Sequence, residues 1–269
     1  MITPALRQPP TLDIPTLPGV ASRLLHAYGS DDVRIPDLVH ALEGDPGISS
    51  RLLRLANSPY YGFPRKIATL ERAVWLLGRA TVAAVALATT IFRQIGGAVA
   101  PEAEALWTGA YRSALGCRYL ARKLPASPWR SSPDSLFLTG LLHDVGMILF
   151  LAREPELYLD LLRASRSVPE VVEAERAAFG QDHAALTGEA MEIWNFPVGM
   201  VSVCRHHHGG GLRTELLPDW EILAAVDCAL SGEHPVQPLP TLSEGLLEDL
   251  ERYLESVRAE AEGFFRALS

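Results

Sequence analysis

A histidine and an aspartate stand next to each other in an otherwise apolar run, LTGLLHDVGMILF (138–150). Imidazole nitrogen and carboxylate oxygen both suit divalent first-row metals, so His143 and Asp144 can supply two ligands to one ion. Two polar groups within an apolar segment also need partners from other parts of the chain, because burying an unpaired charge is costly. The pair indicates either a metal site or what remains of one in a chain with another function.

More candidate ligands follow this pair along the chain. His183 begins a predicted helix, His207 belongs to a run of three histidines, and Asp227 is an isolated carboxylate in ILAAVDCAL. Each also has an ordinary structural explanation, as a helix cap, a helix end or the edge of a buried helix face. The group is therefore more specific than any of its members.

The sequence predicts no cofactor of a recognisable kind. It has no phosphate-binding glycine loop, because the GGG at 209–211 follows a predicted helix instead of joining a strand to a helix. It also has no serine or cysteine nucleophile motif. The alternative is a single divalent metal, bound by ligands drawn from His143, Asp144, His183, His207 and Asp227.

The composition is ordinary for a soluble globular protein, with 48% apolar and 21% charged residues among 269. The net charge of −8 argues against nucleic-acid binding, which usually brings a basic excess. The longest uncharged stretch, 80–92, is shorter than the roughly 18–20 residues that a membrane span needs. The N-terminus lacks the pattern of a secretory signal, and three cysteines without a CxxC pair fit a reducing compartment. We expect a cytoplasmic protein without a membrane span.

Helical spacing runs through almost the whole chain, and no strand alternation is evident. The pattern therefore predicts an all-α protein, in which Asp45 and Pro46 start one helix and Gly78 separates two others. The His-Asp pair falls inside one long predicted helix, 134–152. The other expected helices are 20–29, 35–44, 45–58, 69–77, 80–92, 103–123, 155–165, 169–178, 181–194, 197–207, 219–230 and one from 242 to the end.

The last predicted helix carries an apolar stripe at alternating three- and four-residue steps. We favour a helix that docks on the core of its own chain. The alternative is a short coiled-coil seam that forms a homodimer through the C-terminal helix, since the stripe is about three heptads long. The stripe consists of Leu247, Leu250, Leu254, Val257, Ala261, Phe264 and Leu268.

These features resemble the HDOD domain, a member of the HD-related superfamily found in bacterial signalling proteins. The segment GDPGISSRLLRLANSPYYGFPRKIATLERAVWLLG (44–78) carries the densest likeness, with LANS and its loop specific to that family. The likeness begins at LPGVASRLL (17–25), continues through 138–150 and through FGQDHAALTGEAMEIWNFP (179–197), and ends near the histidine run.

The resemblance implies a two-lobed bundle of many helices. Residues 1–16 form a lead-in, and 17–208 form the HDOD domain, with an N-lobe at about 17–95 and an HD-like lobe from about 103. Residues 209–269 add C-terminal helices that complete the HD-like lobe. Within the family motif, Asn57, Tyr60 and Tyr61 are candidates for interaction. The aromatic residues either form an exposed partner site or, as we favour, pack between helices.

The resemblance also bears on catalysis. Active HD phosphohydrolases use His…His-Asp…Asp, and the resemblance implies that the position of the first histidine falls on Arg112 here. The absence of that histidine does not depend on the alignment, because no histidine occurs from 41 to 142. A guanidinium group cannot ligate a cation. It can instead pair with Asp144 or Asp227 and replace the charge of the metal. The related HD-GYP phosphodiesterases add histidines after the dyad, and His183 and the His207-His208 pair match these, but the GYP signature is missing.

The resemblance favours a non-catalytic signalling or scaffold module that acts through contacts with other signalling proteins in bacterial regulation. Enzymes of cyclic di-GMP metabolism and two-component regulators are the expected partners. The alternative is a metal-dependent phosphohydrolase or phosphodiesterase with a degenerate metal site. The missing upstream histidine favours the first function, and two bridged metals with open water positions would favour the second.

Overall fold

The structure is a computed structural model that describes residues 14–17, 19–28, 34–58, 61, 63–92, 100–209, 211–233 and 239–268. All regular elements in these ranges are helical, which confirms the predicted all-α class. A short 3-10 turn, Thr214–Leu216, accompanies the α-helices. These are α1 (Gly19–Tyr28), α2 (Ile35–Glu43), α3 (Pro46–Ala56), α4 (Leu70–Phe92), α5 (Ala100–Lys123), α6 (Pro133–Leu142), α7 (Val145–Arg153), α8 (Pro155–Ala164), α9 (Val168–Phe179), α10 (His183–Ile193), α11 (Val198–Arg205), α12 (Leu217–Ser231), α13 (Glu244–Ser256) and α14 (Arg258–Leu268).

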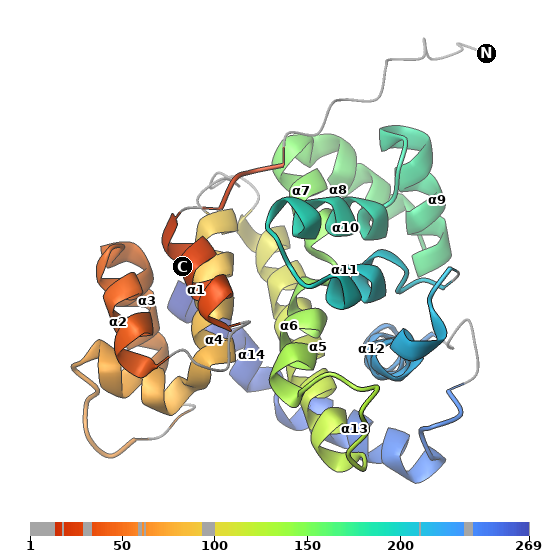
Figure 1. Ribbon diagram of the computed structural model, residues 1–269. Helices are drawn as coiled ribbons and strands as arrows, with labels where there is room; N and C mark the ends of the chain where they lie inside the picture. Colours follow the sequence, from red (N-terminus) through yellow and green to blue (C-terminus); the bar gives the residue numbers. More distant parts are fainter. Residues whose placement is uncertain are drawn as a thin grey trace.

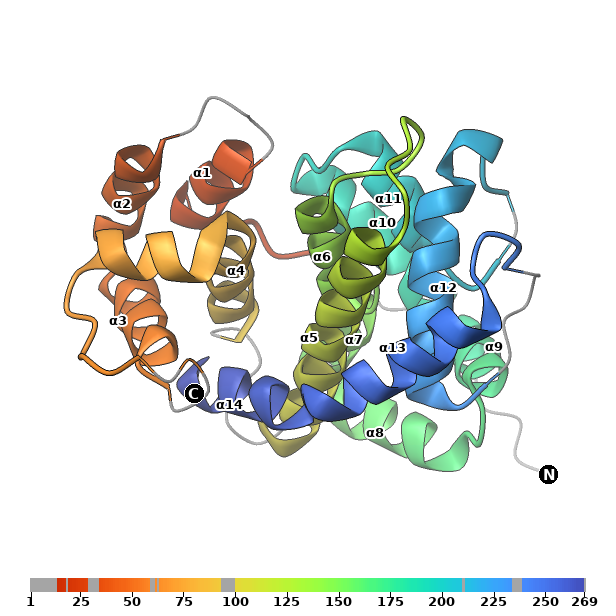
Figure 2. The same ribbon diagram turned by 90° about the horizontal axis from the view of Figure 1, so that it is seen from below.

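The helices form two groups, which Figure 1 shows side by side: an N-lobe made of α1–α4, and an HD-like lobe that runs from α5 to α13. In the view of Figure 2, α5 crosses the middle of the molecule, and α14 extends from the HD-like lobe to α3. A continuous apolar core joins the two lobes, and a smaller core lies between α5, α12 and α13. The described part of the chain therefore folds around shared apolar contacts and not as two separate units.

Helices of the N-lobe begin and break where the sequence signals predict. The Asp45 carboxylate caps α3 by accepting hydrogen bonds from the backbone N–H groups of Gly47 (2.9 Å) and Ile48 (3.1 Å). Gly78 interrupts α4 with φ of 77° and ψ of 161°, a backbone conformation that is essentially restricted to glycine. The predicted separation of two helices at Gly78 is confirmed.

Asn57 stabilises the loop that follows α3. Its amide nitrogen donates to the carbonyl oxygens of Leu53 (2.7 Å) and Ile67 (2.8 Å), and its side-chain oxygen accepts from the Ile67 N–H (2.8 Å). Tyr61 packs against the core, and burial, together with the nearby Glu260 carboxylate, raises the pKa of Tyr61 to about 12. Packing between helices is thus the role of Tyr61, whereas Tyr60 lies outside the described residues.

The predicted helix at 134–152 is in fact two helices, α6 and α7, and the His-Asp pair is the junction between them. Asp144 departs from helical geometry with φ of −105° and ψ of 16°. The first turn of α7 packs directly on α10. A Cβ added to Gly146 would lie only 2.1 Å from the His183 carbonyl oxygen, so only glycine allows this approach. The Gly146 N–H also donates to the Thr187 hydroxyl (2.9 Å). Tertiary contact with α10 therefore breaks a segment that is helical by local pattern.

The C-terminal apolar stripe is divided between α13 and α14, with a break at Val257. Leu250, Leu254, Ala261 and Phe264 are buried within the chain, and Phe264 stacks on Tyr111 with ring centroids 3.8 Å apart. Docking on its own core, the favoured interpretation, is confirmed for these residues. The homodimer stays a prediction.

Two stretches, Leu70–Thr90 and Pro133–Arg153, are long and apolar enough to cross a membrane by length and composition. In each, 78% of the most apolar window is buried inside the protein. They are core helices of the bundle.

Candidate metal site

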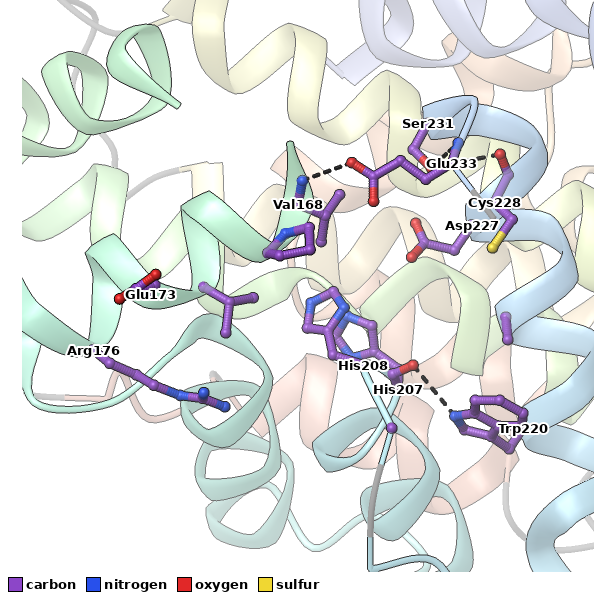
Figure 3. Close-up of a pocket in the computed structure, with 14 residues that line it drawn as sticks. Val168, Glu173, Arg176, His207, His208, Trp220, Asp227, Cys228, Ser231 and Glu233 are labelled. Carbon is purple, nitrogen blue, oxygen red and sulfur yellow. Dashed lines mark hydrogen bonds between the residues drawn. The ribbon is translucent and has the colours of Figure 1, made fainter. Parts of the chain in front are cut away.

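The structure brings the predicted ligands together from four places in the HD-like lobe. His143 and Asp144 lie at the α6–α7 junction, and His183 is the first residue of α10. The histidine run follows α11, and Asp227 belongs to α12, from which its side chain points toward the histidines in Figure 3. His208, which the sequence pattern places only in the wider motif, joins the cluster.

Asp144 stands at the centre of the cluster. One of its oxygens is 3.0 Å from His143 Nε2, and the other is 3.3 Å from His207 Nε2 and 3.5 Å from His183 Nε2. His208 Nε2 lies 2.7 Å from His183 Nε2. Two groups of ligand atoms within 4.8 Å of one another result, one with three histidines (His183, His207 and His208) and one with His143, Asp144 and His207.

Asp227 is the most distant member of the set. Its Oδ1 lies 3.8 Å from His143 Nε2, and its side chain is about one-quarter exposed. Asp227 also lines a cleft at the surface, so its carboxylate faces both the dyad and the solvent.

The imidazole rings are oriented so that their Nε2 atoms face inward. The Nδ1–H of His143 donates to the Gly140 carbonyl oxygen (2.8 Å), and that of His207 donates to the Cys204 carbonyl oxygen (2.7 Å). Since a carbonyl oxygen only accepts, these bonds place a proton on Nδ1, so Nε2 carries a lone pair whenever the ring is neutral. Among the described residues, the Nε2 atoms of His143 and His207 are buried and make no contact with hydrogen-bond geometry, although each faces an Asp144 oxygen, at 3.0 Å and 3.3 Å. Orphaned, inward-facing nitrogens are what a metal ligand set requires.

Nearby carboxylates decide the charge of the rings. Burial alone lowers the pKa of His143, but the Asp144 carboxylate outweighs it and raises that pKa well above its ordinary value. For His183, burial likewise acts against the Glu175 carboxylate, and the pKa rises. Burial and the neighbouring imidazoles lower the pKa of His208 far below its ordinary value. His208 is therefore neutral near pH 7, the form in which imidazole binds metals.

Arg112 does not replace the metal charge, and this prediction is wrong. Its guanidinium donates to the Leu254 carbonyl oxygen (3.4 Å), and its charged neighbours are Arg258, Glu255 and Glu262, on or beside α13 and α14. The rotation of α5 explains why the Arg112 side chain points away from the cluster. The next residue, Ser113, is the one whose backbone lies against Gly140 on α6, and successive residues of a helix point in different directions.

The face of α5 that meets the HD-like core carries Ser113 and, one turn later, Cys117. Both are buried. Burial raises the pKa of the Cys117 thiol well above its ordinary value, and Cys204 and Asp227 raise it further. The Ser113 hydroxyl has no hydrogen-bond partner. Within the described residues, this buried face of α5 thus carries a hydroxyl and a thiol, and no imidazole.

A cleft of 650 Å³ opens beside the cluster, between α9, the end of α11 and α12. In Figure 3, His207 and His208 lie at the centre of the residues that line it, with Glu233 and Arg176 farther out. Glu233 accepts a hydrogen bond from the Val168 N–H (2.7 Å) across the cleft. Solvent and small molecules can therefore reach at least part of the cluster.

Sequence reasoning missed Glu175, which contacts His183. A signal was available: Glu175 stands on the buried stripe of α9, between Val172 and Phe179, where a carboxylate is out of place. The cleft had no signal in the sequence, since its walls come from segments that are far apart along the chain.

The fold and the cluster define a helical domain of the HD type, with a His-Asp pair at the junction of two core helices. Residues 14–209 match the model of the HDOD domain. The chain belongs to the HDOD family.

A relative from Treponema pallidum (strain Nichols), described as "Uncharacterized protein", is 26% identical over 235 residues. The alignment covers 85% of this chain and 45% of the relative, so the chain spans less than half of that protein.

Solved structures share the fold at low sequence identity. A "Putative signal transduction protein" from Marinobacter aquaeolei VT8 has a TM-score of 0.81 at 20% identity, over 96% of this chain and 60% of its own. An HDOD domain protein with unknown function from Geobacter sulfurreducens has 0.71 at 21%, over 96% and 94%. A "Putative phosphohydrolase" from Shewanella amazonensis SB2B has 0.67 at 20%, over 95% of each chain.

Proposed function

We propose that this chain is a non-catalytic signalling module that binds one divalent transition metal and acts through contacts with other regulatory proteins. Asp144, His183, His207 and His208 would hold the ion, a set of nitrogen and oxygen donors that suits zinc and its first-row neighbours. When bound, the ion would crosslink α7, α10 and the segment after α11 and would act as a Lewis acid toward any ligand in the cleft. The orphaned Nε2 of His207 is the observation that supports an ion at this place.

Arg112 points away from the cluster, and α5 supplies no histidine to it. Both features support a site that binds a metal without hydrolysing a substrate. Hydrolytic sites of the two-metal type clamp both the attacking and the leaving oxygen. A second ion would have to rest on His143, Asp144 and Asp227, with no imidazole from α5. One ion with four protein ligands is the arrangement that the residues favour.

Contacts with partners are supported by the surface of the N-lobe. Trp75 on α4 is 71% exposed and borders a groove of 410 Å³ with Ile35 and Leu76. Exposed tryptophans are common at the centres of protein interfaces. We expect cytoplasmic signalling proteins as partners, such as enzymes of cyclic di-GMP metabolism or two-component regulators.

A metal-dependent phosphohydrolase is the second candidate, because the cleft favours it. Structural metal sites are closed, whereas catalytic sites keep an open position. The 650 Å³ cleft reaches His207, His208 and Asp227, which leaves room for a phosphoester beside the ion.

Metal content tests the site on which both candidates rest. Untagged protein purified without chelators is loaded with Zn²⁺, Mn²⁺ or Fe²⁺, desalted and measured by plasma mass spectrometry, together with His207→Ala and a control, His40→Ala. His40 has a 91% exposed side chain and lies outside the cluster. We expect about one ion per chain in the wild type and in His40→Ala, and little in His207→Ala. A wild type that binds no ion contradicts the proposal.

The loaded proteins are then incubated with bis(p-nitrophenyl) phosphate and with cyclic di-GMP. We expect no hydrolysis above the level of His207→Ala. Hydrolysis that His207→Ala abolishes and His40→Ala retains would establish the second candidate instead.

A further inference from the structure

A fully buried carboxylate supports one ring of the cluster from behind. Glu175 of α9 is 0% exposed, and its oxygens accept three hydrogen bonds. Oε2 accepts from the backbone N–H of His183 (2.8 Å) and lies 2.6 Å from His183 Nδ1. Oε1 accepts from the Tyr158 hydroxyl (2.7 Å), which belongs to α8. The contacts join α8, α9 and α10 behind the site.

This support differs from that of the other rings. His143 and His207 donate from Nδ1 to neutral backbone carbonyls, whereas His183 donates to a carboxylate. A carboxylate behind an imidazole fixes its tautomer and makes the opposite nitrogen a stronger metal ligand. Nε2 of His183 is the atom that faces Asp144 and His208.

Glu175 has no arginine or lysine partner among the described residues, and its one ion-pair partner there is His183 itself, when that ring is protonated. Its donors are a phenol, a backbone N–H and an imidazole, and the adjacent Arg176 is bound to Asp182 instead (2.8 Å). A buried carboxylate needs a counter-charge, which a protonated His183 supplies in the absence of a metal. An ion held through His183 would supply that charge, and Asp144 and Glu175 together would neutralise a divalent one.

We propose that Glu175 is a positioning residue that holds His183 as an Nε2 ligand and provides the second negative charge of the metal site. This inference rests on the proposed metal site. Tyr158 completes the arrangement, because its hydroxyl occupies the carboxylate oxygen that carries no bond to His183. The ion that fits is a divalent metal bound by nitrogen, and not a monovalent cation.

The test is Glu175→Gln, which keeps the shape and removes the charge. The carboxamide oxygen can still accept both bonds from His183, and its NH₂ group can donate to the Tyr158 oxygen. Glu173→Gln is the matched control, because it makes the same charge change on the same helix at an exposed residue that lines the cleft. We expect Glu175→Gln to weaken Zn²⁺ binding by about 10–100-fold and Glu173→Gln to leave it nearly unchanged.

Cobalt gives a readout of ligand geometry. The visible spectrum of the Co²⁺-loaded protein should change in Glu175→Gln and not in Glu173→Gln. Equal weakening in the two variants would show a general charge effect and would overturn the inference.

Two further measurements keep the outcomes distinct. If His183→Ala loses the metal while Glu175→Gln binds it as tightly as the wild type, the role of Glu175 is refuted and the metal site stands. If His183→Ala and the wild type bind Zn²⁺ equally, the proposed function itself fails. Should Glu175→Gln not fold, the ¹⁵N shifts of His183 in the Zn²⁺-loaded wild type decide, since metal on Nδ1 would exclude the role.

Discussion

Gly146 shows how a single missing side chain positions a metal ligand. It lies two residues after Asp144 and lets the backbone of α7 approach His183, with its N–H bonded to Thr187. Any Cβ there would occupy the place of the His183 carbonyl oxygen, so α7 and α10 would have to separate. Asp144 and His183, which these two helices carry, would separate with them.

We therefore expect Gly146→Ala to cost about 1–3 kcal/mol of unfolding free energy, the usual effect of overpacking, and to reduce metal binding. Urea unfolding and metal content measure the two effects. Gly109→Ala on α5 is the control, because nothing lies within 4 Å of the added Cβ. A Gly146→Ala protein as stable as Gly109→Ala would show that the close approach does not hold the helices.

Residue types alone identify most of the site. His143, Asp144, His183, His207 and Asp227 are all recognisable in the sequence, because polar groups on apolar segments need partners. The direction of Arg112 is not, because it depends on the rotation of α5, which the sequence leaves open. Glu175 escapes notice because a glutamate on an amphipathic helix is usually solvated.

At the scale of elements, the points at which helices break are harder to predict from the sequence than the helices themselves. Helical periodicity predicts nearly every helix, including the core pair α5 and α6. It joins α6 to α7, however, because the apolar period continues on both sides of LLHDVGM and its glycine alone does not mark a break. Contact of α7 with α10 makes that break, and sequence periodicity does not report contacts between distant segments.

The break in α4 has a local cause, because Gly78 itself adopts the non-helical conformation. Gly78→Ala would place a side chain at φ of 77° and ψ of 161° with no neighbour within 4 Å. We expect a loss of about 1–3 kcal/mol from backbone strain alone. Chemical denaturation of this variant beside Gly109→Ala measures it. An unchanged midpoint would mean that α4 can straighten at no cost.

At the scale of the whole molecule, a metal would stabilise one lobe in particular. The four proposed ligands join segments of the HD-like lobe, and none lies in the N-lobe. An ion at about 100 times its dissociation constant adds about 2.7 kcal/mol to the folded state. For a chain of this size we expect the melting temperature to rise by about 5–10 °C on loading with Zn²⁺.

Calorimetry with and without Zn²⁺, followed by addition of a chelator, checks this rise. His207→Ala should melt at the same temperature under both conditions. Hydrogen exchange should slow in α7 and α10 and stay unchanged in α1–α3. Protection that increased equally in both lobes would place the ion elsewhere.

The position of α14 has a consequence for how the chain is made. It is synthesised after every other helix of this domain, yet it contributes Phe264 and Ala261 to the core that joins the two lobes. Its Glu260 lies 3.4 Å from the Tyr111 hydroxyl at the centre of α5. During translation, part of the apolar surface of the earlier helices stays uncovered until α14 has left the ribosome. The nascent domain is therefore most exposed to aggregation just before its completion, when chaperones would have the most surface to bind.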